Sequence, residues 1–309
     1  MRIAIVGIGG VGGYIGAKFC SLMEAHPKQY EIHFIARGKH AEAVKTEGLT
    51  LIEEEGTFTA FPSAVTAAEE ASGTFDLILL CVKSYDIEAA VTALRHTIRP
   101  DTVIIPFANG VDNAETVRRL VDAKVLNGCA YILSHIVKPG VVRRQGKVFA
   151  ALFGDPEYIG EGLHVGYLFK DAGLRAMTPE TIETALWKKY LFISAFATLT
   201  SYYDTPIKAV YDAHYSVAET LLREIAAVAA ARGIDLGEEV AKALETAAGL
   251  PQEASTSMHL DFRNRRRTEL EALTGYIVRE AERLGVSVPK MATMYHALKE
   301  RLQREAIEA

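Results

Sequence analysis

The sequence predicts an α/β domain built on a doubly wound parallel sheet with an antiparallel extension, followed by an all-α domain. Its 309 residues are enough for two domains with separate cores, at about 150 residues per domain. Short apolar runs alternate with helical stretches in the first part, which is typical of a parallel sheet with right-handed crossovers. From about Pro179 onward almost every segment has a helical pattern. We therefore expect domains at 1–178 and 179–309.

Apolar runs and the turns between them define the elements of the first domain. Parallel strands are expected at Ile3–Val6, Ile32–Ala36, Leu77–Val82 and Thr102–Phe107. Helices are expected over about Val11–Ala25, up to about His96, and from Asn109-Gly110 to about Val121. The acidic turn 53–56 separates Leu49–Ile52 from Thr57–Phe61 and predicts a β-hairpin.

The antiparallel extension is expected after Lys124, where the alternation of strand and helix stops. The strand-like runs there are Val125–Ile136, Val141–Arg144 and Val148–Phe153. Two short turn sequences join them, Pro139-Gly140 and Gln145-Gly146-Lys147. Each turn predicts a hairpin.

Glycine and proline separate the helices of the second domain, at Gly233, Gly249-Leu250-Pro251, and Gly285 with Pro289. Thr268 and Glu271 have the spacing of a capping box, which predicts a helix start there. Glu269 would then lie in the first turn, where the helix dipole favours a carboxylate.

Composition excludes several classes of protein. Hydrophobic residues make up 49% and charged residues 24%, which indicates a globular chain. The net charge of −5 argues against nucleic acid as a partner. The three cysteines are far apart and the nine histidines form no metal-binding pair, so we expect no metal and a reducing cytoplasm. No apolar run reaches the roughly 18 residues of a membrane span, and a strand at the N-terminus leaves no room for a signal peptide.

A glycine loop follows the first expected strand directly and opens a helix. Its sequence matches GxGxxG at Gly7, Ile8, Gly9, Gly10, Val11 and Gly12. In this context the first glycine permits a tight turn, the second lets backbone approach a pyrophosphate, and the third allows close packing of helix on strand. A strand-turn-helix with chance glycines is the alternative. The context favours a Rossmann-like dinucleotide site.

The residue at the end of the second strand indicates which dinucleotide binds. NAD-dependent enzymes usually carry an acid there, for the ribose 2′-hydroxyl. Here the strand ends at Arg37, whose guanidinium suits a 2′-phosphate. A solvated loop arginine is the alternative, and the position favours NADP.

Lys189 lies on a helix that includes Trp187 to Ile193 and is apolar nearly all round. At helical spacing it shares a stripe with Ile193 and Ala197, whereas Lys188 points away from that stripe. Partial burial lowers a lysine pKa toward the range useful for proton transfer. A snorkelling lysine is the simpler alternative.

The second domain also contains a cluster of four arginines, at Arg263, Arg265, Arg266 and Arg267. Acidic residues surround them, so we expect ion pairs or contacts with phosphates of a small ligand rather than with nucleic acid.

These motifs together resemble the ketopantoate reductase family (2-dehydropantoate 2-reductases) over essentially the whole chain. The matching segments, in order, are the glycine loop with Arg37, Cys81-Val82-Lys83, Phe107-Ala108-Asn109-Gly110-Val111, Leu186-Trp187-Lys188-Lys189, and Ser257 to Asp261 with Arg266, Thr268 and Glu269. The resemblance implies an NADP (NADPH) site that includes Lys83 and Asn109. It also implies Lys189 as general acid, Glu269 as its catalytic partner, and Asn109, Ser257 and Arg266 as substrate-binding residues.

Four positions differ from the usual family pattern. Ile193, Ala197 and Ala254 stand where the family usually has asparagine, and Thr274 precedes Gly275 where Asn-Gly is usual. A site that loses hydrogen-bonding partners loses affinity for substrate hydroxyl groups. The identity of the 2-oxo acid is therefore left open.

The resemblance implies a cytoplasmic reductase that converts a 2-oxo acid to a 2-hydroxy acid, with 2-dehydropantoate, of pantothenate biosynthesis, as the first candidate. One alternative is a related NADP-dependent hydroxyacid dehydrogenase with a less polar substrate. The other is a non-catalytic NADP-binding redox sensor, against which Lys189 and Glu269 argue. The expected partner is a small 2-oxo acid, and a homodimer is left open.

Overall fold

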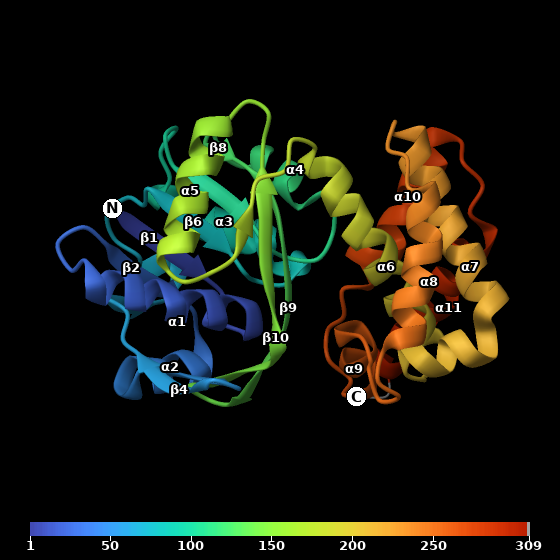
Figure 1. Cartoon of the computed structure of the whole chain (residues 1–309), viewed down its shortest axis with the longest axis horizontal. Coiled ribbons are helices and arrows are strands. Elements are labelled where there is room, and N and C mark those ends of the chain that lie inside the picture. The colour runs from blue at the N-terminus through green and yellow to red at the C-terminus, as the bar shows by residue number, and fades with distance from the viewer. Residues whose placement is uncertain (308–309) are drawn as a thin grey trace. The chain divides into compact units, whose positions relative to one another are not determined.

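The computed structural model describes residues 1–307, with side chains described up to residue 305, and these form two compact units. Unit 1 comprises Met1–Ala108 and Asp112–Ile182, the blue to yellow-green part of Figure 1. Unit 2 comprises Asn109–Val111 together with the chain from Glu183 onward. The short segment Asn109–Val111 thus groups with the helical unit, which the sequence pattern did not indicate.

Unit 1 contains the predicted parallel sheet. Its order is β5-β2-β1-β6-β7-β8, and all five neighbouring pairs are parallel. The strands are β1 (Arg2–Val6), β2 (Glu31–Ile35), β5 (Ala64–Thr66), β6 (Leu77–Leu80), β7 (Val103–Pro106) and β8 (Lys124–Val125). The strand order reverses between β1 and β6, and at such a point doubly wound sheets bind ligands.

Two apolar cores cover the two faces of this sheet. Ile3 and Ile5 of β1 face one core, and Ala4 and Val6 face the other, so the strand is buried on both sides. Helices α1 (Gly10–Ala25) and α5 (Ile159–Asp171) contribute to the first core. Helices α3 (Ile87–Leu94) and α4 (Asn113–Arg118) contribute to the second. The remaining helices of unit 1 are α2 (Gly38–Glu47) and the 3₁₀ turns Ala68–Glu70, Ser84–Asp86 and Arg95–Thr97.

The two antiparallel pairs, β9–β10 and β3–β4, lie in a second, mixed sheet, in which β10 also pairs parallel with β3 and β11. It has the order β11-β10-β3-β4, with β9 paired to β10. Its strands are β3 (Leu49–Glu53), β4 (Gly56–Ala60), β9 (Asn127–Lys138), β10 (Val141–Gly154) and β11 (Ala176–Met177). The predicted hairpins at 53–56 and at Pro139-Gly140 are confirmed.

The hairpin predicted at Gln145-Gly146-Lys147 is wrong. Strand β10 runs through this segment, and its register against β9 shifts between Gln145 and Phe149. Gly146 has φ +66°, so the glycine supplies a left-handed residue to a β-bulge rather than to a turn.

Unit 2 is built almost entirely of helices. They are α6 (Ile182–Tyr203), α7 (Ile207–Ala231), α8 (Gly237–Gly249), α9 (Ser257–Arg263), the π-helix Glu271–Gly275, α10 (Tyr276–Leu284) and α11 (Pro289–Ile307). One continuous apolar core joins them, with Trp187 and Tyr190 of α6 each 1% exposed. Within residues 1–307, no helix is both long and apolar enough to cross a membrane.

The predicted capping box at Thr268 and Glu271 does not form. The helix starts at Leu270, and the carbonyl of Glu269 accepts the N–H of Leu273 at 3.0 Å. Glu269 is therefore the residue at the cap, not a member of the first turn. Glu271 instead bonds to Arg279 across the π-helix, at 2.6 Å, which takes its carboxylate away from the cap.

Candidate functional site

The glycine loop after β1 adopts the tight geometry that its pattern predicts. Gly7 has φ +84°, and a Cβ on Gly12 would lie 1.9 Å from the carbonyl oxygen of Gly7. A Cβ on Gly10 would lie 2.2 Å from the carbonyl oxygen of Ser134. At Gly9, by contrast, nothing lies within 4 Å of that position. The loop is thus tightly packed at Gly10 and Gly12, and has free space beside the backbone only at Gly9 among these three glycines.

This open position lies at the N-terminus of α1. Gly9 caps the helix without a side-chain hydrogen bond, and the first turn holds no acidic residue. The first N–H groups of the helix and its partial positive charge therefore suit the pyrophosphate of a dinucleotide. Ile8 is 2% exposed and Val11 packs beside the same core, so these two residues would contribute through their backbone.

Arg37 is the second residue after β2 and the N-cap residue of α2. Its side chain is exposed, and it forms no ion pair with any side chain of residues 1–305. Gly38, next to it, has φ +75° and open space around it. An unpaired guanidinium at this strand end fits a phosphate on the ribose of the dinucleotide.

His40 belongs to the same loop region, and no sequence pattern indicates a role for it. Its Nδ1 accepts the N–H of Gly140 at 3.0 Å, so Nε2 carries the proton and donates to the carbonyl of Ile8 at 2.9 Å. Burial lowers the pKa of His40 below its ordinary value. The neutral His40 ring thus connects the glycine loop to the β9–β10 turn. Because Gly140 lies 100 residues from His40 in the sequence, no local pattern predicts this contact.

Lys83 and Asn109 follow the carboxyl ends of two neighbouring parallel strands. Lys83 comes after β6, directly before the 3₁₀ turn Ser84–Asp86. Asn109 comes after β7, in the short segment that belongs to unit 2. Strand ends in a doubly wound sheet are the usual place for cofactor contacts.

Lys189 and Asn109 are joined directly in unit 2. Lys189 is half-buried on α6, and its Nζ donates to Oδ1 of Asn109 at 3.1 Å. Lys188 is exposed and lies 3.2 Å from the carboxylate of Glu239. The predicted difference in burial between the two lysines is confirmed. Two residues 80 positions apart in sequence thus form one polar pair.

Glu269 is 2% exposed and directly precedes the helical turn that contains the π-helix. Hydroxyl groups on one stripe of α6 hold this irregular turn. Tyr190 and Ser194 donate to the carbonyl of Leu273 at 2.6 and 2.8 Å, and Thr198 bonds to Thr274 at 2.7 Å. π-Helical turns occur frequently at functional sites, and this one fixes the backbone beside a buried carboxyl group.

Ser257 is the first residue of α9 and is exposed. Arg266 is exposed in the loop that follows α9, where its N–H donates to the carbonyl of Asp261 at 2.8 Å. The ion pairs expected for the arginine cluster are absent for Arg263, Arg265 and Arg266 within residues 1–305. Three guanidinium groups are thus available to anions.

Three of the four positions that depart from the family pattern, Ile193, Ala197 and Ala254, carry apolar side chains. Ala197 is 0% exposed, and Ile193 packs against the core of unit 2. The carbonyl of Ala254 accepts the N–H of Ile207 at 2.9 Å. None of these three side chains can donate or accept a hydrogen bond, whereas the fourth position, Thr274, bonds to Thr198 at 2.7 Å.

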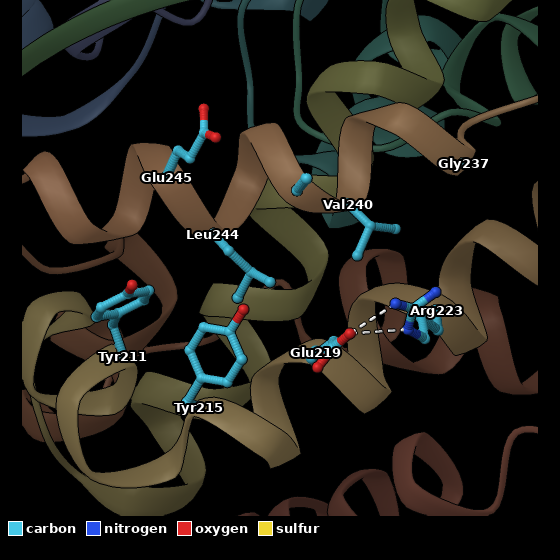
Figure 2. A pocket seen from close by; sticks show the side chains of 9 residues that line it. Tyr211, Tyr215, Glu219, Arg223, Gly237, Val240, Leu244 and Glu245 are labelled. Atoms are coloured by element: carbon cyan, nitrogen blue, oxygen red, sulfur yellow. Dashed lines mark hydrogen bonds and ion pairs between the residues drawn. The ribbon is translucent and has the colours of Figure 1, made fainter.

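A separate pocket of about 230 Å³ lies between α7 and α8. Figure 2 shows Tyr211, Tyr215 and the ion pair of Glu219 with Arg223, 2.6 Å long, at this pocket. It is smaller than most small-molecule sites, and none of the predicted site residues lines it. Within the described side chains, no group of His, Cys, Asp and Glu could hold a metal ion.

Comparison with known proteins gives matches along nearly the whole chain. The family described as ketopantoate reductase PanE/ApbA matches residues 3–156, and its C-terminal counterpart matches residues 181–302. An uncharacterized oxidoreductase, YkpB, of Bacillus subtilis is 29% identical, over 96% of this chain and 97% of its own. The 2-dehydropantoate 2-reductase of Pyrococcus horikoshii is 27% identical, over 94% and 93%. The crystal structure of 2-dehydropantoate 2-reductase from Porphyromonas gingivalis has a TM-score of 0.84 at 35% identity, covering 96% of this chain and 99% of that one.

Proposed function

The chain belongs to the ketopantoate reductase family, and we propose that it uses NADPH to reduce a 2-oxo acid to the 2-hydroxy acid. The family consists of oxidoreductases with a nicotinamide cofactor. The observation that carries the proposal is the 3.1 Å hydrogen bond between Lys189 Nζ and Asn109 Oδ1. This bond joins the half-buried amine of Lys189 to Asn109, which comes shortly after strand β7 of the parallel sheet.

The residues of unit 1 suit the dinucleotide. The N–H groups at Gly9 and the start of α1 would hold the pyrophosphate, and Arg37 would hold the 2′-phosphate that distinguishes NADPH from NADH. Lys83 supplies a second positive charge at the end of β6. When bound, the nicotinamide supplies the hydride for the reaction.

The residues of unit 2 suit the proton transfer. As the substrate carbonyl gains a hydride at carbon, its oxygen gains negative charge, and Lys189 Nζ would donate a proton to that oxygen. Asn109 holds the amine in place through its Oδ1. Glu269 would position the lysine or the substrate, while Ser257 and Arg266 would bind the carboxylate. Solvent returns the proton to Lys189, which balances the reaction.

A less polar 2-oxo acid is the second candidate substrate, beside 2-dehydropantoate. Ala197 is fully buried and Ile193 packs on the core, so neither position can bind a substrate hydroxyl group. Of the two, only the partly buried Ile193 could contact the substrate, where it would favour an apolar tail over a hydroxyl group.

A panel of 2-oxo acids tests the proposal. The purified protein is mixed with NADPH and with 2-dehydropantoate or branched and straight-chain 2-oxo acids, and the loss of NADPH absorbance is followed. We expect turnover of at least one acid, with a higher kcat/KM for an apolar acid if Ile193 faces the substrate. Binding of NADPH without turnover of any 2-oxo acid would support a redox sensor instead.

A further inference from the structure

Three successive hydroxyl residues precede and begin α9: Ser255, Thr256 and Ser257. The first two hydroxyls are hydrogen-bonded inside unit 2. The hydroxyl of Ser257 is exposed and has no partner among the side chains and backbone of residues 1–305. The fold therefore leaves one of three equivalent groups available to a ligand.

The hydroxyl of Thr256 belongs to a chain of hydrogen bonds with a fixed direction. Thr200 donates to the carbonyl of Phe196 at 2.6 Å, so its oxygen must accept the proton of Thr256, 2.8 Å away. Thr256 in turn accepts the N–H of His259 at 3.2 Å, which caps α9. Thr200 is 0% and Thr256 is 5% exposed. This chain anchors the start of α9 to α6.

The hydroxyl of Ser255 is held by the side chain of the same histidine. His259 is 2% exposed, with Nδ1 2.6 Å from Ser255 Oγ and Nε2 2.8 Å from Asp204 Oδ1. The bond to His259 lowers the pKa of Asp204, so this carboxyl is ionised and Nε2 must be the donor. Ser255 Oγ bonds to the other ring nitrogen, Nδ1.

Asp204 lies in the turn between α6 and α7 and has φ +50°. A residue other than glycine is unfavourable in this left-handed region and needs surrounding contacts to stay there. The ring of His259 supplies such a contact, and Asp204 in return fixes the ring. His259 thus bonds to both residues that precede Ser257 and to a separate turn of unit 2.

We propose that His259 is a positioning residue for substrate binding, which fixes Ser257 through its bonds to Ser255, Thr256 and Asp204. This inference rests on the proposed function, in which the Ser257 hydroxyl binds the carboxylate of a 2-oxo acid. His259 itself is 2% exposed, so we expect it to act through Ser257 and not through direct contact with the substrate. Its effect acts on substrate affinity and not on proton transfer.

Three substitutions test the two side-chain hydrogen bonds of His259 one at a time and together. His259→Gln can still donate to Asp204, His259→Asn can still bond to Ser255, and His259→Leu can do neither. With 2-dehydropantoate and NADPH, we expect His259→Leu to raise KM about tenfold, with kcat changed less than about threefold. The KM values of His259→Gln and His259→Asn should lie between those of wild type and His259→Leu. A fall in kcat with unchanged KM would overturn the proposal.

A double-mutant cycle with Ser257→Ala tests whether His259 acts through Ser257. If it does, His259→Leu causes little further rise in KM when Ser257 is already alanine. Equal effects of His259→Leu in both backgrounds would show an independent role and overturn the proposal. His214→Leu is the matched control: it removes the ring stacked 3.7 Å from Tyr203, next to Asp204, without a bond to α9. It should leave KM unchanged.

Hydrogen exchange supplies a readout that does not depend on turnover. His259→Leu should lose amide protection over residues 256–262 and keep it in α7 and α11, whereas Ser257→Ala should keep it throughout. Unchanged protection over 256–262 in His259→Leu would contradict the inference even if no 2-oxo acid is turned over. Failure of every acid with wild-type protein would instead contradict the proposed function.

Discussion

Arg37 is the side chain that we propose selects NADPH over NADH. It is exposed at the end of β2 and forms no ion pair within residues 1–305, so its full charge is available to a phosphate. Only NADPH carries the 2′-phosphate that this guanidinium could bind through two parallel hydrogen bonds.

Arg37→Ala should therefore remove most of a preference for NADPH. We expect wild-type protein to bind NADPH at least about tenfold more tightly than NADH, which corresponds to about 1.4 kcal/mol. The variant should bind NADPH more weakly and NADH with unchanged affinity, as measured by nucleotide fluorescence titration. Equal affinities of wild-type protein for the two nucleotides would contradict the assignment.

His40 makes the stability of unit 1 depend on pH. Because burial lowers its pKa in the fold, the unfolded chain takes up a proton at a higher pH than the folded chain does. Stability therefore falls as pH drops through about 6.5, the ordinary histidine pKa. His33 is half-buried, and burial lowers its pKa too, so it acts in the same direction.

His40→Gln should reduce this pH dependence. The measurement is the free energy of unfolding by urea at pH 7.5, 6.5 and 5.5, for wild type, His40→Gln and His33→Gln. We expect each variant to lose less stability on acidification than wild type. A His40→Gln profile parallel to that of wild type would show that the ring does not have to stay neutral.

At the scale of elements, α6 has two functions on adjacent stripes. Lys189 and Ile193 lie on one stripe, and Tyr190, Ser194 and Thr198 lie on the next. The second stripe holds the π-helix through hydroxyl groups. Two of these donors share the carbonyl of Leu273, so each can partly replace the other.

The shared carbonyl predicts non-additive losses of stability. Tyr190→Phe and Ser194→Ala should each cost about 1 kcal/mol, because one donor to Leu273 remains. The double variant leaves that buried carbonyl without either donor and should cost clearly more than the sum of the two single changes. Chemical denaturation of all four proteins measures this, and strict additivity would argue against the shared role.

The buried position of Ala197 also limits substitutions on α6. Asparagine at Ala197 would place a polar group in a core with 0% exposure, so we expect loss of stability there rather than a gain of function. Ile193→Asn is the informative change, since Ile193 is only partly buried. It should raise kcat/KM for 2-dehydropantoate relative to apolar 2-oxo acids if this side chain faces the substrate, and an unchanged ratio would exclude that orientation.

At the scale of the whole molecule, sequence patterns predicted the parallel sheet and the helical unit because their apolar runs are long and regular. The pattern did not reveal β5 and β11, which have three and two residues, or the bulge at Gly146, whose sequence is equally typical of a turn. Helix α5, between β10 and β11, was not predicted either. Short edge strands and bulges depend on tertiary pairing more than on local periodicity.

The site residues also divide into those that a local sequence pattern predicts and those that depend on tertiary contacts. The glycine loop, Arg37 and Lys189 carry local signals of spacing and position. His40 and His259 do not, since their partners Gly140 and Asp204 lie 100 and 55 residues away. A homodimer stays a prediction, which sedimentation velocity of the purified protein would test.

We propose that Lys189 donates the proton in an NADPH-dependent reduction of a 2-oxo acid. Its adjacent lysine is the matched control, because Lys188 is exposed and paired with Glu239. The decisive measurement is kcat with NADPH and the best 2-oxo acid, for wild type, Lys189→Ala and Lys188→Ala. We predict a fall of about 10² to 10⁴ for Lys189→Ala, with NADPH affinity nearly unchanged, and near wild-type activity for Lys188→Ala. Equal activities of the two variants would contradict the account.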